Sequence, residues 1–309
     1  MKSILILSNT SDYHSDLLVS ASESRGFRCF RWNTDLERDR GRVWSDFSGD
    51  SWIGNEHQKV RVSDLDLVFV RRPTRAYSLR HGDWLSQMLD DEWQSFECGF
   101  TYMGHPRLVN PPAASVLARN KLVQMRYAAN AGLRIPETII TNCRESLLQF
   151  AEGREVISKA VSYGSVDDGE YVRTGYTRTV SSKDIRNTRE FRSPTLLQQR
   201  VAPVAMWRIV TIGHQTYSFR LTGPELQEAE DSRFVETKLS GAFVETPEVV
   251  RTGLLNVCQL FGICYASSDF IEDSHGSLFF IDLNPEGQWA HYEKEFGVPL
   301  SERLVELAL

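Results

Sequence analysis

The sequence has no long hydrophobic run and no paired cysteine motif. None of its apolar stretches approaches the roughly 18 residues of a membrane span, so no transmembrane helix is expected. The N-terminal MKSILILSNT runs directly into polar residues without a signal-peptide cleavage site, and is expected to form a strand. The five cysteines include no CxxC pair, which indicates a reducing, cytoplasmic setting rather than a disulfide framework or a zinc site.

Basic residues are fewer than acidic residues in this sequence. Lys and Arg number 35 against 41 Asp and Glu, the formal net charge is −6, and the basic residues are dispersed. This argues against a nonspecific nucleic-acid binder, which would need a basic face, but leaves room for a local anion site. No GxGxxG supports dinucleotide binding, and the seven histidines lack the HxxxH and HxH spacings of a metal site.

What is present is an ordinary globular composition over 309 residues, of which 41% are apolar. In roughly the first 110 residues, short apolar runs alternate with helical patterns, which predicts a parallel α/β unit. The expected strands are 3–8, 27–32 and 65–70, and the expected helices are 15–25 and 83–96. Residues 33–60 have weak periodicity and are expected to form an elaborated loop, with Trp44 and Trp52 as anchors rather than a substrate platform.

Asn110-Pro111-Pro112 breaks the chain and marks a domain junction. Beyond it the pattern is α+β with antiparallel hairpins. The expected helices are 113–131, closed by Gly132, then 145–150, 247–261 and much of the chain from 289. The expected strands are 135–140, 155–160, 196–201, 205–212, 216–222, 265–272 and 278–283.

The most informative segment is YASSDFIEDSHGSLFFIDLNPEG, at 265–287. A tight turn at His275-Gly276 places Asp269 opposite Asp282, with Asn284 on the same face and Ile281 on the other. Two carboxylates and an amide, all oxygen donors, suit Mg²⁺ better than zinc. The alternative is that the two carboxylates face solvent or pair with arginines.

Because Mg²⁺ in such a site completes its coordination with phosphate and water, cations that bind phosphate are expected nearby. Lys159 lies inside an apolar strand and precedes the loop 162–169, where Gly164 and Gly169 would let backbone N–H groups approach a phosphate. Lys121 opens a helix behind Asn120. Arg208 and Arg220 lie on the two strands of the 205–222 hairpin. Together these residues outline a nucleotide–magnesium site.

In this order the motifs resemble an ATP-grasp ligase, and in particular the enzymes that make microviridin-type graspetides. The resemblance covers essentially the whole chain. It is densest in VFVRRP (68–73), HPRLVNPPAASVLARNKLVQM (105–125), GYTRTVSSKDI (175–185) and IDLNPEGQW (281–289). It implies an N-terminal pre-ATP-grasp α/β domain over 1–112, a central ATP-grasp subdomain over 113–197 and a C-terminal α+β subdomain over 198–309.

The resemblance also implies roles for single residues. Lys121 and Lys159 would contact ATP phosphates, the strand with Gln198, Gln199 and Val201 would bind adenine, and Asp269, Asp282 and Asn284 would hold Mg²⁺. Arg208, Lys159 and Arg220 are the predicted catalytic residues. The chain departs from the pattern at Gln199, at Trp207 and at Asp282, where relatives often have Glu, an acidic residue and Glu respectively.

The activity so implied is ATP-dependent ligation of an Asp or Glu side chain in a precursor peptide, through an acyl phosphate, to a Ser or Thr hydroxyl or a Lys amine. The cofactors would be ATP and Mg²⁺, the leader of the precursor would contact region 190–222, and a homodimer is allowed, with no nucleic-acid or membrane partner. Two alternatives stay open: an ATP-grasp ligase acting on a small-molecule carboxylate, and a catalytically silent ATP- or peptide-binding protein.

Arg71 and Arg72 follow the predicted strand 65–70. The carboxyl ends of parallel strands are where α/β domains bind ligands, so these two guanidinium groups could hold a carboxylate-rich peptide. The alternative is one exposed arginine and one in a structural ion pair.

Overall fold

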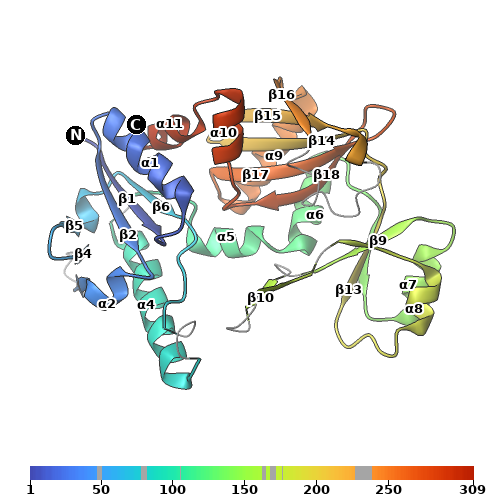
Figure 1. Cartoon of the computed structure of the whole chain (residues 1–309), viewed down its shortest axis with the longest axis horizontal. Coiled ribbons are helices and arrows are strands. Elements are labelled where there is room, and N and C mark those ends of the chain that lie inside the picture. Colours follow the sequence, from blue (N-terminus) through green and yellow to red (C-terminus); the bar gives the residue numbers. More distant parts are fainter. Residues whose placement is uncertain are drawn as a thin grey trace. The chain divides into compact units, whose positions relative to one another are not determined.

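The computed structural model describes residues 1–46, 51–77, 82–104, 106–161, 165–167, 172–175, 177–226 and 239–309 (Figure 1). The chain forms two compact units. Unit 1 comprises Met1–Ser115, Ile263–Tyr265 and Gln288–Leu309, and unit 2 comprises Val116–Gly262 and Ala266–Gly287. No helix among the described residues is long and apolar enough to cross a membrane. The division at residues 112 and 197 stays a prediction.

Unit 1 is built on a parallel sheet of order β2-β1-β6-β7, which confirms the α/β prediction. Its strands are β1 (Ser3–Ser8), β2 (Arg28–Asn33), β6 (Leu67–Val70) and β7 (Arg107–Val109). Its larger helices are α1 (Tyr13–Ser24) and α4 (Trp84–Met103). The apolar strand residues are nearly all buried, because both faces of a parallel sheet are covered.

The prediction of a loop over 33–60 is wrong. These residues hold a short helix and a three-stranded antiparallel sheet, each element of only three or four residues, too short to give a clear period. The elements are α2 (Glu37–Arg40), β3 (Arg42–Ser45), β4 (Ser51–Gly54), β5 (Lys59–Arg61) and the following turn η1 (Val62–Asp64).

The single helix predicted at 113–131 is two helices, α5 (Pro112–Ala118) and α6 (Lys121–Asn130). Asn120 separates them, because its side-chain oxygen accepts the N–H groups of Leu122 and Val123 and so caps a new helix. Gly132, with φ +81°, follows the end of α6 as predicted.

The first part of unit 2 is a sheet of order β12-β9-β13-β8 with helices α7 (Arg144–Ala151) and α8 (Ser182–Asn187). Leu147, Val156, Ile185 and Leu197 form its buried core. Its strands are β8 (Thr138–Thr141), β9 (Val156–Lys159), β12 (Arg178–Val180) and β13 (Thr195–Gln199). A separate pair is formed by β10 (Ser165–Asp167) and β11 (Val172–Thr174).

The second part of unit 2 is a sheet of order β16-β15-β14-β17-β18 with helix α9 (Glu248–Phe261). The two predicted hairpins are confirmed. The strands are β14 (Ala205–Ile212), β15 (Gln215–Thr222), β16 (Ser240–Val244), β17 (Tyr265–Glu272) and β18 (Leu278–Asn284), with the short helix η2 (Pro224–Leu226).

After β18 the chain rejoins unit 1 and is mostly helical, as predicted. The C-terminal helices are α10 (Ala290–Phe296), α11 (Leu300–Val305) and η5 (Glu306–Ala308). Helix α11 packs beside α1 (Figure 1).

Candidate active site

A cavity in unit 2 lies between its two larger sheets. It brings together Lys159, Gln198, Gln199, Val201 and Asp269 from the predicted set. Apolar side chains make up much of the remaining lining: Ile157, Pro203, Met206, Leu226, Phe270, Ile271 and Ile281. A largely apolar cavity with a few convergent polar groups is the usual form of a small-molecule site.

Lys159 ends β9, and its side chain is held by a buried glutamine. Its Nζ donates to Gln198 Oε1 at 3.0 Å, and Gln198 Nε2 donates to Thr138 Oγ1 at 2.9 Å. Gln198 is 1% exposed. The structure therefore gives the Gln198 side chain a positioning contact with the ammonium group, a role that the sequence did not indicate.

At the end of β13 the backbone leaves the sheet. Gln199 N–H donates to Glu137 O and Arg200 N–H to Glu155 O, both at 2.8 Å. The next N–H, that of Val201, donates to no described residue, and Val201 lines the cavity. A backbone donor without a partner among the described residues suits the edge of a planar heterocycle at this point.

Strands β17 and β18 place Asp269 opposite Asp282 and Ser267 opposite Asn284. The pairing agrees with the prediction, but the turn does not. Asp273 and Ser277 close the turn, and a bulge after Asp269 restores the register. At the bulge Ile281 has no partner, and it lines the cavity together with Asp269.

Each of the two carboxylates has a basic partner. Arg208 Nε lies 2.7 Å from Asp269 Oδ1, and its Nη1 donates to Ser267 Oγ at 3.3 Å. Lys121 Nζ pairs with Asp282 Oδ1, while Asn284 Oδ1 accepts the N–H of Glu286 at 2.9 Å. Two of the predicted cations, Lys121 and Arg208, thus lie against the two predicted carboxylates as neutralised pairs, and the partner of Asp269 is an arginine, as in the alternative.

Lys121 is the first residue of α6, which is fixed to β18 by Gln124. Gln124 Nε2 donates to Leu283 O at 2.7 Å, and its Oε1 accepts Leu283 N–H at 3.2 Å. These bonds hold Lys121 beside Asp282. The contact between Gln124 and Leu283 joins residues 159 positions apart, and no sequence pattern signals it.

Arg220 is not brought to this group. Strand pairing sets it opposite Trp207, whereas Arg208 is opposite Phe219, so the two arginines lie on opposite faces of the sheet. Arg220 forms a bidentate pair with Glu272, in which Nε donates to Oε2 at 2.7 Å and Nη2 donates to Oε1 at 3.2 Å. Trp207 Nε1 also donates to Glu272, and these hydrogen bonds, that of Arg220 above all, lower the pKa of the carboxyl.

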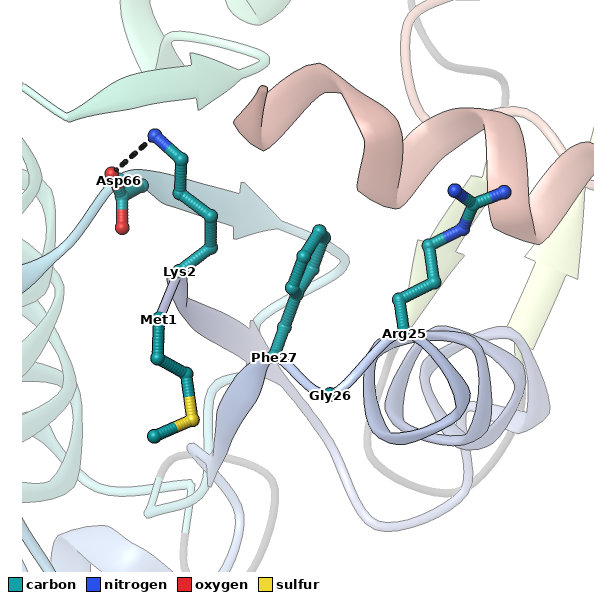
Figure 2. Close-up of a pocket in the computed structure, with 6 residues that line it drawn as sticks. All are labelled: Met1, Lys2, Arg25, Gly26, Phe27 and Asp66. Atoms are coloured by element: carbon teal, nitrogen blue, oxygen red, sulfur yellow. Dashed lines mark hydrogen bonds and ion pairs between the residues drawn. The ribbon is translucent and has the colours of Figure 1, made fainter.

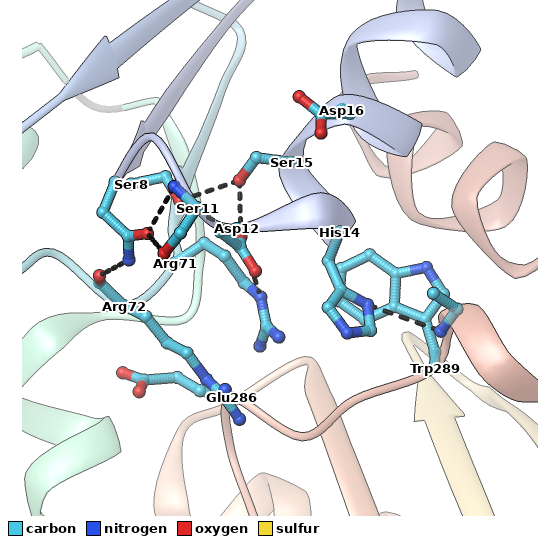
Figure 3. Close-up of polar contacts among 12 residues, drawn as sticks. Ser8, Ser11, Asp12, His14, Ser15, Asp16, Arg71, Arg72, Glu286 and Trp289 are labelled. Atoms are coloured by element: carbon cyan, nitrogen blue, oxygen red, sulfur yellow. Dashed lines mark hydrogen bonds and ion pairs between the residues drawn. The ribbon is translucent and has the colours of Figure 1, made fainter.

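In unit 1, Arg71 and Arg72 follow β6, and Figure 3 shows their side chains with those of Asp12, His14 and Trp289. Arg71 is 3% exposed, its Nε lies 3.4 Å from Asp12 Oδ2, and its Cζ lies 5.0 Å from the centre of the Trp289 ring. Arg72 has φ +49°, and Asn9 Nδ2 donates to its carbonyl at 2.9 Å. Arg71 therefore has the buried ion pair of the structural alternative.

His14 lies beside this pair, against Trp289 at 4.5 Å between ring centroids. Burial, and then the positive charge of Arg71, lower the pKa of His14 to about 4. Its imidazole is therefore neutral at pH 7, and it adds no charge to the arginines.

This lowered pKa predicts a pH-dependent stability. Between pH 6.5 and about 4 the unfolded chain binds a proton that folded His14 does not, so the free energy of unfolding falls as the pH falls. At pH 5 the loss from this group is about 2 kcal/mol relative to pH 7. Urea unfolding of the parent and of H14N at both pH values tests this, and an unchanged pH dependence in H14N would contradict it.

A separate depression lies in unit 1, at the ends of β1 and β6 opposite to Arg71, and is lined by Met1, Lys2, Arg25, Gly26, Phe27 and Asp66 (Figure 2). Lys2 pairs with Asp66 at 2.8 Å, and Arg25 pairs with Glu302 and Glu306. It contains no predicted site residue.

No group of three or more His, Cys, Asp or Glu side chains in the described ranges could hold a metal ion by itself. A magnesium site in unit 2 would accordingly need the amide of Asn284 and oxygens of the nucleotide besides Asp269 and Asp282. Gly164 and Gly169 of the predicted phosphate loop lie outside the described residues.

Solved structures show the same fold. The macrocyclase MdnC of Microcystis aeruginosa MRC, bound with precursor peptide MdnA, is similar with a TM-score of 0.86, 22% identity and coverage of 100% of this chain and 99% of that one. A RiPP-associated ATP-grasp ligase of Chryseobacterium gregarium, in complex with ADP and a leader and core peptide, gives 0.86, 20%, 100% and 96%. The ATP-grasp ligase PsnB, with a phosphomimetic minimal precursor, Mg and ADP, gives 0.78, 18%, 100% and 98%.

No protein-family model and no curated protein matches the sequence. The structural likeness nevertheless spans the full chain, and it confirms the expected ATP-grasp fold.

Proposed function

We propose that the chain is a cytoplasmic ATP-dependent carboxylate ligase that closes ester or amide links within a precursor peptide. The observation that carries the proposal is the pair of ion pairs on the β17–β18 hairpin, Arg208–Asp269 and Lys121–Asp282, beside a cavity lined by Lys159. When a nucleotide binds, its phosphate oxygens would replace Asp269 and Asp282 as the partners of Arg208 and Lys121. The full-length likeness to ATP-grasp ligases bound to precursor peptides supports the same function.

The chemistry has two steps. A substrate carboxylate takes the terminal phosphoryl group of ATP to give an acyl phosphate and ADP, and a hydroxyl or amine then displaces phosphate. Lys159, Lys121 and Arg208 would offset the charge that builds up on the transferred group. The Val201 N–H would bind the adenine edge. Arg220, on the other face of the sheet, is left out of this set.

The donor set fits Mg²⁺, because Asp269, Asp282 and Asn284 can each bind it through a side-chain oxygen. Bound Mg²⁺ supplies charge neutralisation at the phosphates. Arg208 and Lys121 already balance the two carboxylates, so we expect the metal to bind well only together with the nucleotide.

For the precursor we propose that the leader lies along 190–222 and that acidic core residues lie near Arg72, with Arg71 as its buried neighbour. A homodimer remains a prediction.

The test is ATP consumption by the purified chain with Mg²⁺ and a candidate precursor rich in Thr, Glu and Asp, while peptide mass is followed. Loss of one water per bond formed, dependent on ATP, is the expected result. ATP consumption without a mass change would indicate a small-molecule carboxylate instead. Nucleotide binding without turnover of any carboxylate would contradict a ligase and favour a silent binding protein.

A further inference from the structure

We propose that the outer face of the β3–β4–β5 sheet binds an acidic peptide segment. The outer face is the set of side chains on the solvent side of these strands: Arg42, Trp44, Trp52, Lys59 and Arg61, with Gly54 among them. The source of such a segment would be the precursor peptide, and in that respect the inference rests on the proposed function.

Strand pairing puts these residues on one face. Trp44 is opposite Trp52, which is opposite Arg61, and Arg42 is opposite Gly54, which is opposite Lys59. Residues directly opposite one another share a face, and so do residues two apart along a strand. The tryptophans and the cations therefore form one surface that crosses all three strands.

The other face of the sheet fixes this orientation. Ile53 and Val60 are 1% and 9% exposed, and they belong with Val43 to the core cluster that contains Leu5 and Phe30. Turning the sheet over would bury the three cations, so packing of the core forces the aromatic and basic side chains outward.

The outer face has an unusual composition for this chain. Its three charged residues are all basic and exposed, although acidic residues outnumber basic ones overall. Trp44 is 41% exposed, which is high for a side chain of this size. Lys59 Nζ lies 3.7 Å from the centre of the Trp52 ring, so an ammonium group and an aromatic surface are presented together.

Gly54 separates two of the cations at one end of the face. Gly54 lies between Arg42 and Lys59 on the central strand and offers no side chain. A Cβ there would come within 2.6 Å of Gln58 O, so the tight β4–β5 turn itself requires glycine. Arg42 and Lys59, both exposed, lie on either side of Gly54, where acidic side chains of a bound peptide could pair with them.

An extended acidic peptide matches this surface. Its alternate residues are spaced like Arg42 and Trp44, so carboxylates could meet the cations while apolar groups cover the rings. A single-stranded nucleic acid could also stack on tryptophans, but three cations on a chain of net charge −6 are little to hold a long polyanion.

The test uses the full chain and a fluorescein-labelled peptide of alternating Glu and Thr, with a Gln-Thr peptide as neutral probe. We expect R42Q/K59Q to weaken binding of the acidic peptide at least about fivefold at low salt, and W44A to weaken it similarly. The matched control K294Q/R303Q, which removes the same charge from unit 1, should bind as the parent does. Added salt should weaken binding by the parent more than binding by R42Q/K59Q.

Equal binding of the neutral peptide, unchanged binding by R42Q/K59Q, or displacement of the peptide by oligo(U) at lower concentration would each overturn the inference. Nucleotide binding should be unaffected in R42Q/K59Q, because neither residue lines the unit 2 cavity. A parent that binds the acidic peptide here but ligates no peptide would uphold the surface and refute the proposed function. Ligation of the precursor without binding of the acidic peptide at this face would support the proposed function and refute the binding surface.

Discussion

Replacing Asp282 by asparagine is expected to lower ATP-dependent turnover by about a hundredfold or more. The substitution keeps the shape of the side chain but removes the charge that pairs with Lys121 and that would hold Mg²⁺. The fold should persist, because Asp282 is half-buried and its neighbour Leu283 stays bonded to Gln124. Turnover is measured as ADP formation with Mg²⁺ and peptide, and circular dichroism checks the fold.

Two variants make this prediction specific. D273N removes the same charge from the turn of the same hairpin, where Asp273 only accepts backbone N–H groups, and should stay within about twofold of the parent. D282E should retain much of the activity if the carboxylate is a metal ligand, since Glu is the commoner residue in the resembled family. A fully active D282N would remove the carboxylate pair from the proposed mechanism.

The fold was predictable where local pattern and tertiary packing agree. Strands β1, β6 and β14 are largely apolar runs bounded by turn residues, and each formed where it was expected. The prediction over 33–60 failed because β3, β4 and β5 are too short to show a period and gain their stability from the core beneath them. The prediction of one helix over 113–131 overlooked the helix cap at Asn120, although an asparagine at this position is a recognised signal for the start of a new helix.

The candidate site was predictable to the extent that strand alternation decides it. Asp269 and Asp282 were matched although the turn was placed one residue off, because a bulge compensates, and no sequence signal marks that bulge. Arg220 shows that two residues of one hairpin need not share a site. It lies on the strand that pairs with that of Arg208, but the register of the two strands puts the two arginines on opposite faces of the sheet. Gln124 and Gln198 act through contacts with residues distant in sequence, which pattern reasoning does not reach.

The same limit applies to a buried charge cluster in unit 1. Arg38 of α2 contacts Glu97 Oε2 at 2.6 Å and Asp90 Oδ1 at 3.2 Å, and its Nη1 also donates to Thr74 O at 2.7 Å. Trp32 Nε1 donates to the same Glu97 at 3.0 Å. The side chains of the three charged residues are at most 6% exposed, so each charge depends on the others for its solvation.

Replacing Arg38 by methionine is therefore expected to lower the free energy of unfolding by about 3–5 kcal/mol at pH 7, since two buried carboxylates lose their cation. Asp90 also accepts the N–H groups of Ala76 and Tyr77, so the loss should extend to the segment that follows Arg71 and Arg72. Urea unfolding followed by tryptophan fluorescence measures the change.

The control is R25M, which removes a cation from partly exposed pairs with Glu302 and Glu306 and should cost about 1 kcal/mol or less. An R38M loss no larger than that of R25M would mean that Asp90 and Glu97 are stabilised by backbone and Trp32 contacts alone. Those contacts, and not the guanidinium, would then fix α4 against the segment that follows β6.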